Sequence, residues 1–193
     1  PYTRLDGIEL ILDGYHGDVF TNPSLLLRQQ YAEVVEEERL INRDLDSLRG
    51  LPCVTLDGHH LPLWVNTGLL ADVKRAQQRG AEGVGLYRSE VAFMGTSRFP
   101  SESEQVVMYR EQLQAFHPLP VTMRTLDIGG DKPLSYFPIK ESNPYLGWRG
   151  IRITLDHPEI FLVQVRAMIK ASAGLDNLHI LLPMISGVHE LDD

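Results

Sequence analysis

Three arginines stand at or near the ends of apolar segments, where a buried positive charge is costly unless an anion meets it. Arg88 closes the run 83–88, Arg124 lies inside the run 121–128, and Arg149 follows a loop rich in glycine and proline. A guanidinium group binds carboxylate or phosphate through parallel hydrogen bonds. The residue types therefore indicate recognition of a small anion.

The segment around Arg124 carries the strongest local indication of such a site. Asp127 would face the opposite side of a regular strand, so we do not expect it to be the direct partner of Arg124. An anionic ligand or a carboxylate from elsewhere is left as the partner. The glycine pair at 129–130 can expose backbone N–H groups, and Lys132 adds a positive charge.

Each arginine also has a plain structural interpretation. Arg88 could form a surface ion pair with Glu90, two residues later in the chain. Arg149 and Arg152 could lie on the surface of a helix. Spacing alone does not choose between these interpretations and an anion site.

Strand and helix patterns alternate from residue 61 onward. The expected strands cover residues 61–67, 83–88, 121–128 and 178–185, and the expected helices cover 69–79, 101–116 and 158–173. Ser101 and Glu104 form a capping box at the start of the second of these helices. Apolar strands that alternate with helices predict an α/β fold with a parallel sheet.

Four such units make the first half of a (β/α)8 barrel of the TIM type. A small doubly wound open sheet is the alternative, and periodicity does not separate the two. The sequence stops at Asp193 soon after the fourth strand, without a last covering helix, so we favour the half barrel and expect a truncated C-terminus. In a β/α barrel the C-terminal ends of the strands form the ligand-binding face, where Arg88 would lie.

The first 50 residues have a different pattern. Short β-prone runs at 8–12 and 18–21 flank a turn and predict a hairpin, the last edge of a domain whose body lies upstream. A long polar helix is expected from Ser24, as its N-cap, to about Arg49, with apolar residues on one face that must be buried. We therefore expect three regions, comprising residues 1–23, 24–50 and 51–193.

Composition limits the classes of protein to consider. The chain has 193 residues and a formal net charge of −8, and it has no block of Lys or Arg, so nucleic acid is not an expected partner. Cys53 is the one cysteine, which favours a reducing compartment. No apolar run reaches the roughly 20 residues of a membrane span, and no signal peptide is visible. We expect a cytoplasmic protein that starts, at Pro1, inside a longer polypeptide.

Together, the arginine segments resemble the signatures of enzyme I, the phosphoenolpyruvate-protein phosphotransferase. The segments read Gly-Leu-Tyr-Arg-Ser-Glu, Arg-Thr-Leu-Asp-Ile-Gly-Gly-Asp-Lys-Pro and Asn-Pro-Tyr-Leu-Gly-Trp-Arg-Gly-Ile-Arg. The likeness covers about residues 61–193, and Leu-Leu-Pro-Met-Ile at 181–185 resembles the next strand of the same barrel. The turn at 13–19 resembles the closing strands of the family's swivelling phosphohistidine domain. Among the branches of the family, the sequence of the chain is most similar to the nitrogen-related one.

The resemblance implies roles for particular residues. Arg88 and Arg124 would bind the phosphate of phosphoenolpyruvate (PEP), and Arg149 would help to fix the substrate anion. Ser89 stands where the family usually has Thr, which keeps the hydroxyl group. Arg152 receives no firm role.

The resemblance also implies what this chain lacks. The family's phosphorylated histidine, its Mg²⁺ ligands and its catalytic cysteine lie in segments outside this sequence. We therefore assign no catalytic residue and no metal ligand here, and we expect the chain to be inactive alone. His16, His59 and His60 are expected to be turn residues.

The expected partners follow from the same likeness. They are PEP, a histidine-containing phosphocarrier protein that binds through missing domains, and further copies of the chain, because a half barrel leaves strand edges unpaired. Two other functions stay open. One is a relative of pyruvate phosphate dikinase or PEP synthase, and the other is a non-catalytic sensor that binds PEP.

Overall fold

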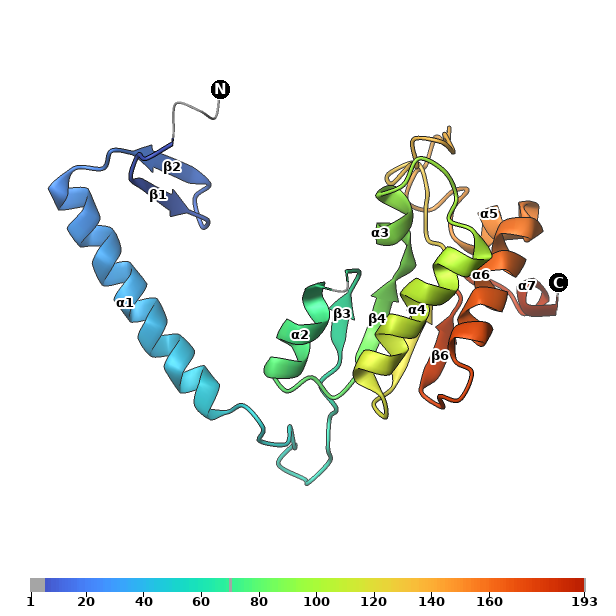
Figure 1. Cartoon of the computed structure of the whole chain (residues 1–193), viewed down its shortest axis with the longest axis horizontal. Helices are drawn as coiled ribbons and strands as arrows, with labels where there is room; N and C mark the ends of the chain where they lie inside the picture. The colour runs from blue at the N-terminus through green and yellow to red at the C-terminus, as the bar shows by residue number, and fades with distance from the viewer. Residues whose placement is uncertain (1–5, 70, 193) are drawn as a thin grey trace. The chain divides into compact units, whose positions relative to one another are not determined.

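The computed structural model describes residues 6–69 and 71–192. Contacts divide the chain into two compact units, Pro1–Leu51 and Pro52–Asp193 (Figure 1). The first unit contains β1 (Leu10–Asp13), β2 (Asp18–Thr21) and α1 (Leu25–Ser47).

A cluster of hydrogen bonds around Asp13 holds the first unit together. β1 and β2 form the expected antiparallel hairpin, with Asp13 opposite Asp18. The Asp13 carboxylate accepts hydrogen bonds from the backbone N–H groups of Tyr15 (2.9 Å) and His16 (3.1 Å), which closes the turn. It also accepts one from the Tyr31 hydroxyl of α1, at 2.7 Å. Asp13 therefore joins the hairpin to the helix.

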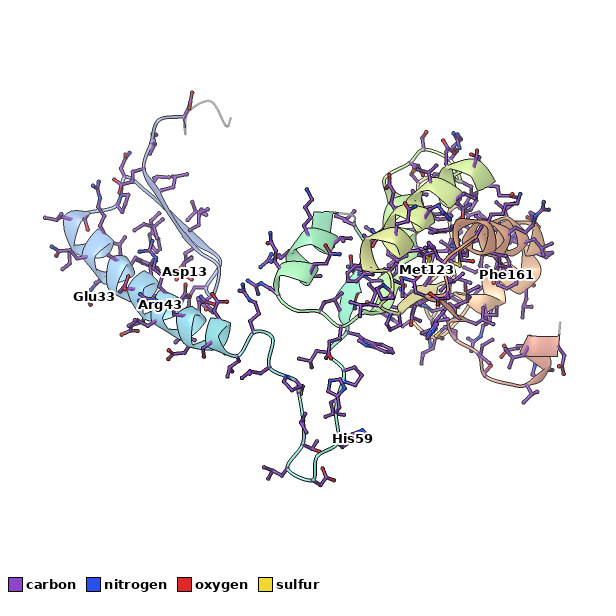
Figure 2. All side chains as sticks on the ribbon, turned by 60° about the horizontal axis from the view of Figure 1, so that its bottom comes forward. Asp13, Glu33, Arg43, His59, Met123 and Phe161 are labelled. Atoms are coloured by element: carbon purple, nitrogen blue, oxygen red, sulfur yellow. The ribbon has the colours of Figure 1, made fainter. Side chains whose placement is uncertain are left out.

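The long helix α1 begins as predicted but is not buried as predicted. Ser24 is its N-cap and accepts a hydrogen bond from the Leu27 backbone N–H. None of its residues is buried, because the small hairpin is the one other element of its unit in the described chain. Figure 2 shows Glu33 and Arg43 on this helix.

The second unit contains the remaining elements. They are β3 (Val65–Thr67), α2 (Ala71–Gln78), β4 (Val84–Arg88), α3 (Ser89–Met94), α4 (Glu102–Phe116), β5 (Val121–Arg124), α5 (Ile151–Asp156), α6 (Pro158–Ala171), β6 (Leu178–Leu181) and α7 (His189–Asp192). β3, β4, β5 and β6 lie side by side in this order, and each neighbouring pair is parallel.

One face of the sheet carries the main core. Tyr87 of β4 and Met123 of β5 pack there with buried residues of α2, α4 and α6. Figure 2 shows Met123 among closely packed side chains. Strands in sequential order with their helices on one face are typical of a β/α barrel wall, whereas a doubly wound sheet places helices on both faces. The predicted α/β class is confirmed, and the unit is consistent with a partial TIM-type barrel.

The strands are shorter than the sequence predicts. β5 was expected to reach Ile128 but ends at Arg124, because the backbone then leaves the ladder. The Thr125 N–H still donates to the Leu181 carbonyl, while the Leu126 N–H donates to the side chain of Gln164. α4 has the predicted capping box of Ser101 and Glu104. The short helices α3, α5 and α7 were not predicted.

No helix in the described part of the chain combines the length and apolar character needed to cross a membrane.

The Asp13 cluster predicts the pH dependence of the first unit. The Tyr31 hydroxyl, and then His16, lower the pKa of Asp13, while Asp13 raises the pKa of His16. A lowered carboxyl pKa stabilises the fold above its unfolded value of about 3.9, and a raised imidazole pKa stabilises it below about 6.5. The contribution of this cluster is therefore greatest between about pH 4 and pH 6.5.

We expect Asp13→Asn to lower the pKa of His16 toward about 6.5, because the substitution removes its negative partner and keeps an oxygen for the turn. The measurement is an NMR titration of the His16 ring protons. Asp18→Asn is the control, because Asp18 contributes less to the pKa of His16. A His16 pKa that Asp13→Asn leaves unchanged would contradict this account.

Candidate functional site

Two of the three predicted arginines lie next to each other at the C-terminal ends of two neighbouring strands. Arg88 is the last residue of β4 and Arg124 is the last residue of β5, and they are register partners in the parallel ladder. Tyr87 and Met123, the residues just before them, point into the helix-covered core. Because side chains alternate along a strand, both guanidinium groups leave the sheet on the opposite face.

The third arginine reaches the same place through a shared carboxylate. Asp127 lies 3.0 Å from Arg124 Nη1. It also accepts hydrogen bonds from Arg149 Nε (3.3 Å) and from Arg149 Nη2 (3.1 Å). Asp127 is 5% exposed and Arg149 is 8% exposed, so water screens these pairs weakly. One buried negative charge thus serves two guanidinium groups.

The expectation that Asp127 could not be the partner of Arg124 is wrong. It assumed that the strand continues to Ile128, which would place Asp127 on the other face. The strand ends at Arg124, so the backbone turns and brings the carboxylate back to the guanidinium group. Side chains alternate between the two faces of a sheet only within a strand, so the alternation does not apply to two residues on either side of a strand end.

Glu90 supplies a second buried carboxylate. It lies in the first turn of α3, is 1% exposed and accepts a hydrogen bond from Arg124 Nη2 at 2.7 Å. The Lys132 ammonium lies 3.6 Å from the same oxygen. The alternative in which Glu90 forms a surface pair with Arg88 is therefore wrong, since Glu90 is buried and its partner is Arg124.

Arg149 has its N–H groups engaged by protein atoms. Besides Asp127, it donates through Nη1 to Asp131 at 3.1 Å and, over longer distances, to the carbonyls of Pro144 and Tyr145. Gly129 permits this packing, because a Cβ there would lie 2.9 Å from the Arg149 Cβ. The glycine pair that the sequence suggested for anion binding thus has a packing role at its first position.

Arg152 holds the loop before it. Its guanidinium group donates to the carbonyls of Leu146 and Gly147, the latter at 2.8 Å. Sequence analysis gave this residue no firm role, and its contacts are those of a loop-supporting side chain.

Several buried polar atoms at the site have no protein partner among the described residues. They are Nε of Arg88, Nε of Arg124 and one carboxylate oxygen of Glu90. A buried donor without a partner costs about 1–3 kcal/mol, so native proteins normally pair it with water or a ligand. The two Nε groups come from neighbouring strand ends and are suited to an anion.

The formal charges at the site favour an anion as well. The positive groups are Arg88, Arg124, Lys132 and Arg149, and the negative groups are Glu90, Asp127 and Asp131. Four cations against three carboxylates leave one positive charge, in a region of low dielectric where it acts strongly.

These carboxylates do not form a magnesium site. Mg²⁺ needs several oxygen ligands in octahedral geometry, whereas Asp127, Asp131 and Glu90 point at guanidinium or ammonium groups. Within the described residues, no three or more His, Cys, Asp or Glu side chains gather in a way that could hold a metal ion. The residues present thus do not fit the ion.

We expect Asp127→Asn to lower the free energy of unfolding by about 3 kcal/mol, because it leaves two buried guanidinium groups without their shared anion. Urea denaturation of the whole chain measures this loss. Asp131→Asn is the matched control, since Asp131 pairs with Arg149 alone. The control should cost about 1 kcal/mol. Equal losses for the two variants would contradict the sharing.

Comparison with known proteins confirms the resemblance. The model of the "PEP-utilising enzyme, PEP-binding domain" family matches residues 42–193. A protein of Escherichia coli K12 named "Phosphoenolpyruvate-dependent phosphotransferase system" is 48% identical over 95% of this chain and 25% of its own length. The phosphoenolpyruvate-protein phosphotransferases of Staphylococcus carnosus and Bacillus subtilis are 43% and 41% identical over 97% and 99% of this chain.

This chain spans 33% and 34% of the Staphylococcus and Bacillus proteins, so it covers about a quarter to a third of these relatives. The matched region contains the whole four-stranded sheet and all three arginines. The chain therefore belongs to the family of PEP-utilising enzymes, and the match lies in their PEP-binding domain.

Proposed function

We propose that this chain supplies the arginine part of the PEP site in a phosphoenolpyruvate-protein phosphotransferase, which transfers a phosphoryl group from PEP to a histidine of a phosphorelay. The observation that carries the proposal is the pair of neighbouring guanidinium groups, Arg88 and Arg124, whose buried Nε groups have no protein partner among the described residues. The names of the relatives favour this function over a dikinase or a sensor.

The chemistry needs positive charge more than it needs a nucleophile from this segment. The phosphoryl group of PEP carries negative charge on its free oxygens while its bond to the enol oxygen breaks. Fixed guanidinium groups stabilise this charge and hold the group in line with its acceptor. Arg88 and Arg124 would bind these oxygens, since both leave neighbouring strand ends on the same face.

Arg149 would fix the substrate anion in a less direct way. Its donors are engaged by Asp127 and Asp131, so a bond to substrate requires Nη1 to leave Asp131. While Asp131 holds it, Arg149 orients Asp127 and through that carboxylate the guanidinium group of Arg124.

The proposal extends to the rest of the protein. Residues 1–23 would be the last strands of a swivelling phosphohistidine domain, 24–50 a linker helix, and 51–193 the first half of the PEP-binding barrel. Mg²⁺, the phosphorylated histidine and the phosphocarrier partner would belong to segments beyond this chain, and association of copies would cover the free strand edges. The chain alone would therefore transfer no phosphoryl group.

The test is a titration of the whole chain with PEP, followed by NMR of the arginine Nε–H groups. We expect the Arg88 and Arg124 resonances to shift, and we expect Arg88→Lys to weaken PEP binding about tenfold because a single ammonium cannot replace the planar donor pair. The Arg88 Nε group has no protein partner among the described residues, so this substitution should spare the fold.

Arg98→Lys is the matched control, because Arg98 pairs with Glu104 at the start of α4. It should leave PEP binding unchanged. Equal weakening by both variants, or resonances that PEP does not move, would contradict the proposed site.

Incubation of the same chain with labelled PEP and Mg²⁺ should leave it unlabelled, and a stable label would contradict the proposed inactivity.

A further inference from the structure

Gln164 lies close to the strand ends that carry Arg88 and Arg124, and it has no role in the proposed binding step. It belongs to α6 and is 0% exposed. Its side-chain oxygen accepts a hydrogen bond from the Leu126 backbone N–H at 2.7 Å. Its amide nitrogen donates to the Ser89 hydroxyl at 3.1 Å and to the Tyr109 hydroxyl at 3.0 Å. A buried glutamine with all these bonds is costly to replace.

Two of the hydrogen-bond partners of Gln164, Ser89 and Leu126, lie next to residues of the arginine site. Ser89 directly follows Arg88, and its hydroxyl group donates to the Arg124 carbonyl at 2.8 Å. Leu126 is next to Asp127, which holds two of the guanidinium groups. One side chain of α6 therefore connects the end of β4, the end of β5 and the turn that presents Asp127.

The network continues to a firm anchor on α4. The Tyr109 hydroxyl donates to the Gln105 side-chain oxygen at 2.9 Å, and Gln105 donates to the Pro100 carbonyl at 2.9 Å. α4 and α6 pack against each other on the helix-covered face. The position of the strand ends is thus tied to two helices that do not reach the ligand face.

The Leu126 N–H shows why an amide side chain is needed here. It comes after the end of β5, so no strand offers it a carbonyl, and the residue is fully buried. Gln164 supplies the acceptor and keeps a donor for Ser89. An apolar residue of similar size would leave this N–H unpaired and free the turn to move.

We propose that Gln164 is a positioning residue that sets the spacing and direction of Arg88 and Arg124 for the anion without contacting it. This inference rests on the function proposed above. A shift of the strand ends by a fraction of an ångström would separate the two guanidinium groups from the oxygens that they must bind together. The cost would appear in substrate affinity beyond any cost in stability.

Asn177, which directly precedes β6, provides a control beside the first residue of β5, at the opposite end of that strand from Arg124. It is 3% exposed, and its amide nitrogen donates to the carbonyls of Leu113 (3.1 Å) and Leu119 (2.9 Å). Its backbone carbonyl accepts from the N–H of Val121, the first residue of β5. Asn177→Leu therefore removes buried hydrogen bonds from the scaffold far along β5 from Arg124.

The experiment compares Gln164→Met with Asn177→Leu in the whole chain. Both should lower the urea midpoint of unfolding. Gln164→Met alone should move the Nε–H resonances of Arg88 and Arg124 in the ligand-free chain, and it should weaken PEP binding about tenfold, the loss of roughly one buried hydrogen bond. Asn177→Leu should leave the Nε–H resonances of Arg88 and Arg124 in place, since strand register is retained. It should keep the affinity for PEP within about twofold of the parent.

Arginine resonances that Gln164→Met leaves in place would overturn the inference, and so would equal loss of affinity in both variants. If Gln164→Met does not fold, Ser89→Ala takes its place, because it removes the bond from Ser89 to the Arg124 carbonyl. It should move the Arg124 resonance, and an unmoved resonance would also overturn the inference. If the parent chain does not bind PEP, the proposed function fails, while the ligand-free resonances still decide the role of Gln164.

Discussion

The carboxylate of Asp127 is the charge on which the arrangement of the site depends. A guanidinium group buried at the end of an apolar strand is stable only with an anion beside it, and Asp127 stands beside both Arg124 and Arg149. Glu90 meets the other terminal nitrogen of Arg124. Arg124 is thus held from two sides, which fixes the direction of its remaining N–H groups. A ligand that binds there meets donors that need little rearrangement, which is the usual route to strong electrostatic binding in a protein.

The scaffold explains how so many charges can gather without unfolding the unit. The alternation in β4 and β5 sends Tyr87 and Met123 into the helix-covered core and the arginines to the opposite face. Helices α2, α4 and α6 pack on the first of these faces, so the arginines leave the sheet on the face that these helices do not cover. The polar network of Gln164 crosses the helix layer at one place and reaches the strand ends there. Packing and recognition therefore use opposite faces of one sheet.

Much of this fold could be predicted from the sequence, because its signals are local. The Ser24 N-cap, the capping box at Ser101 and the four apolar strands depend on neighbouring residues and are present in the structure. Arg88 ends its strand as strand-end reasoning placed it, and Arg124 lies beside it at the end of the neighbouring strand, whereas Arg149 lies in the loop before α5. The two-unit division falls between Leu51 and Pro52, while the identity of the regions in the first unit stays a prediction.

What could not be predicted depends on where a strand ends and on contacts across the fold. The pairing of Arg124 with Asp127 follows from a strand that is four residues shorter than its apolar run suggests. The burial of Glu90 follows from a short helix, α3, that has no clear signal in the sequence. Gln164 lies 75 residues from Ser89 along the chain, and no local pattern connects the two. The apolar face of α1 predicted burial, yet burial needs a partner surface as well as a pattern.

The most direct test of this account is a crystal structure of the chain with PEP. The account predicts the phosphate within hydrogen-bonding distance of the guanidinium groups of Arg88 and Arg124, with the carboxylate of Asp127 still on Arg124. A phosphate bound elsewhere on the protein, or an Arg124 side chain that leaves Asp127 without contacting the ligand, would contradict it.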